Sequence, residues 1–95
     1  MPSYRVTMVV GALAPGVAPQ QVLPGAKTAA LELTVVEAND VAVVAGEARI
    51  TVRFAADDPE IARQVGAHVA TSTAALADVE RWKLTGLVDG RWIAI

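Results

Sequence analysis

The hexapeptide "RITVRF", residues 49–54, decides the fold because basic or hydroxyl side chains alternate in it with apolar ones. A period of two is the signature of a strand with one buried face and one exposed face. A similar hexapeptide, "RVTMVV", occupies residues 5–10. This near-repetition indicates two related halves, each of which opens with a strand of the same kind.

The first half contains one segment that can be interpreted in two ways. A strand over Tyr4–Ala14 ends at the Pro15-Gly16 break. A helix is then predicted over Pro24–Glu37, since apolar residues recur there at helical spacing and proline suits a first helical turn. Asn39 and Asp40 would end this helix. The competing interpretation makes "LELTVV", residues 31–36, a strand, because apolar residues also alternate there.

The second half is patterned more clearly. Two strands, "VAVVAG" and "EARITVRF", are expected to join at a Gly46-Glu47 turn. Asp58 is a favourable N-cap for a second helix that begins at Pro59. A strand over residues 79–88 and an Asp89-Gly90 turn lead to the last strand, "RWIAI". One face of the second helix is expected to consist of Ile61, Val65, Val69, Ser72 and Leu76.

The order strand, helix, strand, strand, helix, strand resembles the ferredoxin-like plait over the whole chain. The resemblance is one of topology only. It implies an α+β fold with a four-stranded antiparallel sheet, two helices on one face, and here an additional C-terminal hairpin strand. Residues 1–95 would form a single domain of this type, with the two hexapeptides as its inner strands.

Alternation also predicts which side chains meet the helices. Trp82 is expected to be buried against them, whereas Trp92 is expected to be accessible. Tyr4 is likewise expected to point inward. The core residues expected from the strands are Val6, Met8, Val10, Ile50, Val52, Phe54, Trp82 and Leu84.

The opposite face of the sheet is left uncovered by this topology and is expected to be basic. No acidic residue is expected on it from the two inner strands or the fourth strand. The simplest interpretation is that exposed arginine, lysine and threonine keep a bare sheet soluble. The alternative is a groove that receives an anion or an acidic protein partner. The candidate binding residues are Arg5, Arg49, Thr51, Arg53, Arg81, Lys83 and Trp92.

Composition excludes several classes of protein. A hydrophobic content of 54% and a net charge of only −2 are incompatible with a disordered chain. The absence of cysteine excludes thiol chemistry and is compatible with the cytoplasm, which is the predicted location. The single histidine, His68, is expected to pack half-exposed on the second helix, so no histidine-based metal centre is predicted. No apolar run is long enough to cross a membrane.

Nucleic acid is a disfavoured partner. RNA-recognition modules of this architecture stack bases on aromatic residues of the inner strands. Here the outward positions of those strands hold arginine, threonine and valine. The acidic overall balance also lacks the electrostatic footprint of a nucleic-acid binder.

Three functions remain open after these exclusions. The first is a non-catalytic assembly or binding module that uses the open sheet face for homodimerisation or for a protein partner. The second is a regulatory domain that binds a small anionic ligand on the same face. The third, a small dimeric enzyme of the plait type, is disfavoured by the scarcity of titratable groups. No catalytic residue, metal or cofactor is predicted.

Overall fold

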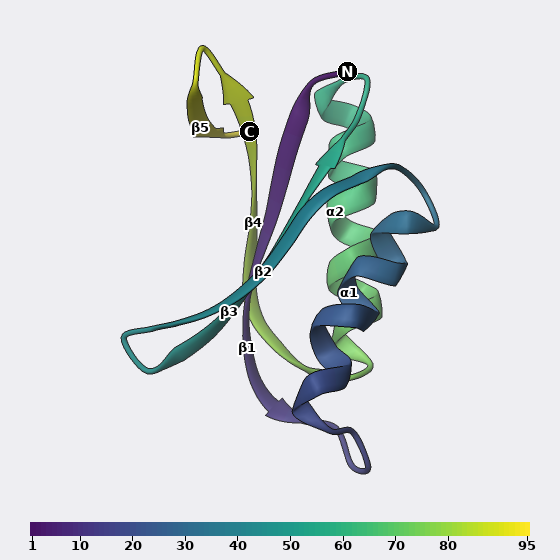
Figure 1. The fold of residues 1–95 in the computed structure, drawn as a ribbon, viewed down its shortest axis with the longest axis vertical. Coiled ribbons are helices and arrows are strands. Elements are labelled where there is room, and N and C mark those ends of the chain that lie inside the picture. The colour runs from purple at the N-terminus through teal and green to yellow at the C-terminus, as the bar shows by residue number, and fades with distance from the viewer.

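The computed structural model describes residues 1–95 as one antiparallel sheet with both α-helices on the same face (Figure 1). The strands follow the spatial order β2-β3-β1-β4-β5, so the strands that contain the two hexapeptides lie side by side. The predicted α+β class, with two helices and an antiparallel sheet, is confirmed. The elements are β1 (Ser3–Leu13), a 3₁₀ turn η1 (Pro19–Gln21), α1 (Val22–Leu31), β2 (Val36–Val44), β3 (Glu47–Ala55), α2 (Pro59–Ala74), β4 (Ala77–Val88) and β5 (Arg91–Ala94).

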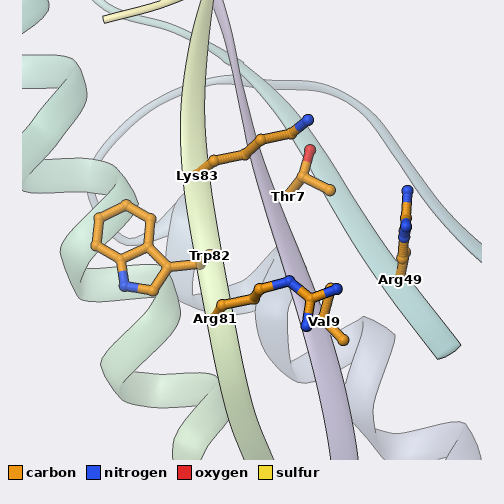
Figure 2. A pocket seen from close by; sticks show the side chains of 6 residues that line it. All are labelled: Thr7, Val9, Arg49, Arg81, Trp82 and Lys83. Carbon is orange, nitrogen blue, oxygen red and sulfur yellow. The ribbon is translucent and has the colours of Figure 1, made fainter.

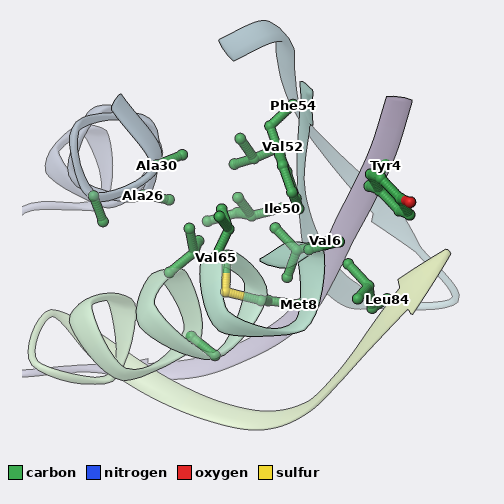
Figure 3. Packing of buried hydrophobic residues seen from close by; sticks show 14 of the residues in the cluster. Tyr4, Val6, Met8, Ala26, Ala30, Ile50, Val52, Phe54, Val65 and Leu84 are labelled. Atoms are coloured by element: carbon green, nitrogen blue, oxygen red, sulfur yellow. The ribbon is translucent and has the colours of Figure 1, made fainter. Parts of the chain in front are cut away.

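The hydrophobic core lies between the sheet and the two helices, as Figure 3 shows. The alternating residues of β1 and β3 fill it, and Val6, Val52 and Phe54 are completely buried. Tyr4 is buried beside Phe54, with the two ring centroids 6.0 Å apart. The helices contribute mainly small side chains, such as Ala26 and Ala30, which allow them to pack close to the sheet.

The helix predicted over Pro24–Glu37 is wrong in its second half. Helix α1 ends at Leu31, and β2 begins at Val36, so Asn39 and Asp40 belong to a strand. The local reason is that β-branched residues in "TVV", residues 34–36, favour extended backbone. The long-range reason is pairing with β3, in which the Ala55 N–H donates a hydrogen bond to the Val35 carbonyl. The competing strand over residues 31–36 is correct only at Val36, because Leu31 is still helical and residues 32–35 form the connection between α1 and β2.

The turn between β2 and β3 lies one residue earlier than predicted. Its central residues are Ala45 and Gly46, with φ angles of 52° and 79°, and Glu47 is the first residue of β3. A two-residue turn with two positive φ angles matches the twist of antiparallel strands. The turn at Asp89-Gly90 was predicted correctly and has the same pair of positive φ angles.

Helix α2 begins as predicted. The Asp58 side chain caps it by accepting a hydrogen bond of 2.9 Å from the Ile61 N–H, and Pro59 opens the helix. Ile61, however, is exposed, and the buried face is rotated toward Ala62, Val65 and Val69. No helix of the structure has the length and apolar character required to span a bilayer.

Trp82 is not buried, contrary to the sequence-based expectation. Its side chain does point toward the helices, and a Cβ atom on Gly66 of α2 would lie 3.1 Å from the indole Cζ3. The strand phase was therefore predicted correctly. The ring nevertheless remains 41% exposed, whereas Trp92 on the open face is half-buried. The alternation along a strand determines toward which face a side chain points. Whether that side chain is buried depends on how far the helix layer extends over the sheet.

Candidate functional site

The open face of the sheet is built from three rows of side chains that cross the strands. Arg5 of β1 lies between Arg53 of β3 and Thr85 of β4. Thr7 lies between Thr51 and Lys83 in the next row. In the third row Val9 is flanked by Arg49 and Arg81, whose aliphatic stems account for its burial on this otherwise polar face. The predicted candidate residues of these strands thus share one surface.

The second and third rows enclose a small pocket, shown in Figure 2. Its volume is about 160 Å³. The Trp82 side chain points to the other side of β4, so this residue contributes its main chain to the wall. The pocket presents three cationic side chains and one hydroxyl to a single small volume. Its lining residues are Thr7, Val9, Arg49, Arg81, Trp82 and Lys83.

An acidic residue also lies on this face, contrary to expectation. Glu47 begins β3 in the same phase as Arg49, and its Oε1 accepts a hydrogen bond of 2.8 Å from Nη2 of Arg81. The same Oε1 is 3.7 Å from Nη2 of Arg49. The hydrogen bond from Arg81 is the main cause that holds the pKa of Glu47 below the usual glutamate value. Glu47 is therefore ionised and partly neutralises the two arginines.

Arg49 retains a donor that no protein group uses. Although its side chain is partly exposed, the Nε atom is buried and has no hydrogen-bond partner. A buried donor without an acceptor is costly, and such atoms are few in native proteins. Lys83 is exposed and forms no salt bridge within 4.0 Å. The pocket therefore has donors to offer in spite of Glu47.

A second hollow of about 270 Å³ lies at the first row, between β1, β3 and β2. Trp92 of β5 reaches over this end of the face, where the guanidinium carbons of Arg5 and Arg53 lie 3.9 and 5.2 Å from its ring centroid. These distances are those of cation–π contacts. The hollow is lined by Arg5, Ala38, Asn39, Asp40, Thr51 and Arg53.

Arg53 is also paired with an acid from β2. Oε1 of Glu37 accepts hydrogen bonds from Nε of Arg53 at 2.9 Å and from the Ser3 hydroxyl at 2.7 Å. The Ser3 hydrogen bond is the main cause that lowers the pKa of Glu37. This ion pair leaves the Arg53 guanidinium engaged with Glu37 and near Trp92, so it is less available to a ligand than the donors of the first pocket.

The seven predicted candidates therefore divide into two groups. Arg49, Arg81 and Lys83 meet in the small pocket, whereas Arg5, Thr51, Arg53 and Trp92 lie at the second hollow or above it. Thr7 completes the first group. Extending the alternation of "RITVRF" back to Glu47 would have placed that acid on the face. The position of Glu37 beside Arg53 could not be predicted in this way, because the sequence up to Glu37 also matched a helix.

The single histidine lies on the opposite side of the molecule, in the helix layer. His68 is half-buried on α2, as expected from the sequence, and its Nε2 is 3.0 Å from Oε1 of Glu32, just beyond the end of α1. This contact joins the two helices. No group of three or more histidine, cysteine, aspartate or glutamate side chains is arranged to hold a metal ion.

Comparisons of the chain with protein-family models, with curated proteins and with solved structures find no match.

Proposed function

We propose that the protein is a non-catalytic binding module that receives a small anionic group in the pocket between Arg49, Arg81 and Lys83. The observation that carries this proposal is the buried Nε of Arg49, which has no hydrogen-bond partner at the wall of a cationic pocket. An oxyanion in the pocket would accept hydrogen bonds from the Lys83 ammonium and from the Thr7 hydroxyl, and a small rotation of the Arg49 side chain would bring its unpaired Nε within reach. Such charge-assisted hydrogen bonds are the strongest kind available to the site.

The size of the pocket limits the ligand. A volume of about 160 Å³ corresponds to roughly five water molecules at ~30 Å³ each. That space suits a phosphate, sulfate or carboxylate group, and a larger ligand would place only its anionic end there. Glu47 restricts the strength of binding, because its carboxylate competes with the anion for Arg49 and Arg81. A site of this type favours exchange of the anion over permanent retention.

The chemistry near the pocket supports binding rather than catalysis. The charged groups beside it are guanidinium, ammonium and a glutamate held in its ionised form. General acid–base catalysis requires a group that exchanges protons near the working pH, and His68 is far away in the helix layer. The sheet face thus supplies positive charge and hydrogen-bond donors but no evident proton carrier.

We also propose that the whole chain is one ferredoxin-like domain, extended at one edge by β5. The β-α-β-β-α-β order, the two inner strands and the placement of both helices on one face support this assignment. A cluster of 17 buried residues drawn from both halves supports a single domain.

An acidic protein partner on the same face is a second candidate. The observation that favours it is the contact of the Trp92 ring with Arg5 and Arg53 on the uncovered side of the sheet. Tryptophan and arginine are the residues most enriched at the energetic centres of protein interfaces. A partner that presents acidic side chains would contact the second hollow, and its binding would depend on Trp92.

Titration calorimetry with sodium sulfate and sodium phosphate tests the anion site at constant ionic strength. We expect Lys83→Gln and Arg49→Gln each to weaken binding by about tenfold, the usual loss for one charge-assisted hydrogen bond. The only other lysine, Lys27, is exposed on α1 and provides the matched control Lys27→Gln, for which no change is expected. Equal affinities for the wild type and all three variants would exclude the pocket as the site.

A further inference from the structure

Strand β2 forms an edge of the sheet that is weakly protected against pairing. Its register irregularity between Val36 and Ala38 and its two acids, Glu37 and Asp40, lie in its first five residues, and Val41–Val44 carries no charge. It is hydrogen-bonded to β3 on one side only, and it runs for nine residues, Val36–Val44. Its sequence, "VEANDVAVV", contains no lysine, arginine or proline, the residues that natural proteins use to block exposed edges. The opposite edge, β5, is only four residues long and begins with Arg91. The part of β4 that β5 does not cover, residues 77–84, carries Asp78, Glu80, Arg81 and Lys83. The two edges are therefore unequal, and β2 is the less charged one.

The side chains of this edge are apolar and exposed. Val41, Val43 and Val44 are exposed by 52%, 76% and 42%. Val41 pairs with Ile50 of β3, and Val43 pairs with Ala48, so both lie on the helix side of the sheet. The β2–β3 hairpin extends beyond the helix layer in Figure 1, in agreement with the exposure of these valines.

An apolar cavity of about 510 Å³ adjoins these valines. It lies between the hairpin and the start of α1, and Val41 forms part of its wall together with Leu13, Val22, Leu23 and Ile50. Leu13 is itself 39% exposed. The exposed edge is thus continuous with an apolar hollow, so a strand added beside β2 would extend an apolar surface that already exists.

We propose that β2 is the self-association edge of this protein, at which two copies pair antiparallel around a two-fold axis through Ala42. The segment Val41-Ala42-Val43 reads the same in both directions, so this axis places Val41 of each copy opposite Val43 of the other. Four valines then meet on the helix side of the sheet, and Val43 of each copy lies beside the cavity rim formed by Val41 of the other. The two five-stranded sheets become one sheet of ten strands.

The neighbouring registers are less favourable. An axis through Asp40 would bring two carboxylates directly opposite each other, and like charges in cross-strand pairs are destabilising. An axis through Val41 would pair Asn39 with Val43, both on the helix side, which sets an amide against an apolar side chain. A register shifted by an odd number of residues would place the Val41 and Val43 side chains of one copy on the opposite face of the joined sheet from those of the other copy. The Ala42 register forms two Val41–Val43 pairs, against one Val41–Val41 pair for the axis through Val41. It also keeps the two aspartates apart, because Asp40 of each copy then lies opposite Val44 of the other on the open face.

A second copy fits this edge because its requirements are symmetrical. The free main-chain donors and acceptors of β2 are satisfied by an identical strand in antiparallel orientation. A two-fold axis perpendicular to the sheet keeps the helices of both copies on one side and leaves both open faces accessible on the other. The self-association edge is consequently independent of the anion pocket. A variant that no longer dimerises should still bind the anion, and a variant that no longer binds the anion should still dimerise.

Sedimentation velocity over a wide range of protein concentration tests the assembly. The wild type is expected to reach twice the 9.9 kDa chain mass. Val43→Lys should remain monomeric at all concentrations, since its ammonium would have to enter the valine cluster. Because Val43 is 76% exposed, this variant should fold, and circular dichroism checks that it does. Ile93→Lys, at an exposed position on the β5 edge, is the matched control and should still dimerise.

Disulfide cross-linking tests the register. The chain has no cysteine, so Ala42→Cys introduces a single thiol, which the two-fold axis places next to its own copy. Mild oxidation should cross-link Ala42→Cys much faster than Ala94→Cys, the control on β5. A monomeric wild type, a dimer that survives Val43→Lys, or equal cross-linking rates for the two cysteine variants would each overturn the proposal. Sulfate affinity should be unchanged in Val43→Lys, which separates this result from a failure of the anion site.

Discussion

The guanidinium carbon of Arg5 lies 3.9 Å from the ring centroid of Trp92, which connects the first strand of the chain to the last. β4 separates the two strands in the sheet, so this contact reaches across a neighbouring strand on the open face. It explains why Trp92 is half-buried on a face that no helix covers. It also attaches the short strand β5, which otherwise depends on its pairing with β4.

Trp92→Ala should therefore destabilise the protein, because it removes side-chain contacts on the open face of the sheet. Loss of the contacts with Arg5 and Arg53 is expected to lower the free energy of unfolding by about 1–2 kcal/mol, the range for cation–π contacts at partly desolvated sites. Trp92→Phe, which keeps an aromatic face, should lose less. Urea unfolding followed by circular dichroism measures both variants. Equal stability of Trp92→Ala and the wild type would mean that the contacts of the Trp92 ring contribute nothing to the free energy of unfolding.

Glu47→Gln should strengthen anion binding. The substitution removes a carboxylate that engages Arg81 at 2.8 Å and lies 3.7 Å from Arg49. Competition by one solvent-screened charge is weak, so sulfate affinity should rise by about two- to fivefold. Glu37→Gln is the matched control, because Glu37 pairs with Arg53 outside this pocket. A sulfate affinity that does not rise in Glu47→Gln would contradict competition at the pocket.

The stability of the protein should decline at acidic pH in part through Glu37. Its folded-state pKa is lowered from the ordinary value of 4.5, chiefly by the Ser3 hydrogen bond. A lowered carboxyl pKa contributes stability that is fully present above the unfolded-state value and is lost as pH falls through the folded-state value. The stability difference between wild type and Glu37→Gln should thus be largest near neutral pH and shrink below about pH 4.5.

A series of urea unfolding curves from neutral to acidic pH provides this measurement. Asp78→Asn, at an exposed position that makes no ion pair, is the control and should follow the wild-type profile. A wild-type advantage over Glu37→Gln that stays constant across the whole pH range would show that the Ser3 and Arg53 hydrogen bonds do not depend on ionisation.

Thr73→Val should stabilise the protein. Thr73 is completely buried in α2, and its hydroxyl oxygen has no hydrogen-bond partner. Valine has nearly the same shape and removes the unsatisfied polar group, for a gain of about 1 kcal/mol. Thermal and urea unfolding provide the measurement. Thr71→Val, at an exposed position of the same helix, should change stability by less than about 0.5 kcal/mol. Destabilisation by Thr73→Val would reveal a partner for the hydroxyl, such as a buried water.

Ala45→Asn should also stabilise the protein, through the turn between β2 and β3. Ala45 has a φ of 52°, in the left-handed region that asparagine tolerates better than alanine. A gain of about 0.5–1 kcal/mol is expected from relief of this strain. Ala45→Val, which places a β-branched side chain in the same conformation, should have the opposite effect. If both variants unfold at the wild-type urea concentration, the turn conformation is not strained.

The residues in the middle of the chain show why one part of the fold was not predictable. Residues 31–36 match both a helix and a strand, because their apolar side chains satisfy both periods. The choice is made by hydrogen bonds such as that from Ala55 to the Val35 carbonyl, between residues distant in the sequence. Local propensity is weaker than such pairing, so the end of α1 and the start of β2 depend on where β3 lies.

The sequence by itself determined the strand phase, the start of α2 and the Asp89-Gly90 turn. These features rest on local chemistry: the alternation of "RITVRF", the side-chain cap of Asp58, and a dipeptide suited to positive φ. Only the tertiary structure decided that Glu47 pairs with Arg81, that Arg5 contacts Trp92, and that Trp82 stays exposed. Those outcomes depend on cross-strand register and on the extent of the helix layer, both of which are set by contacts between residues far apart in the chain.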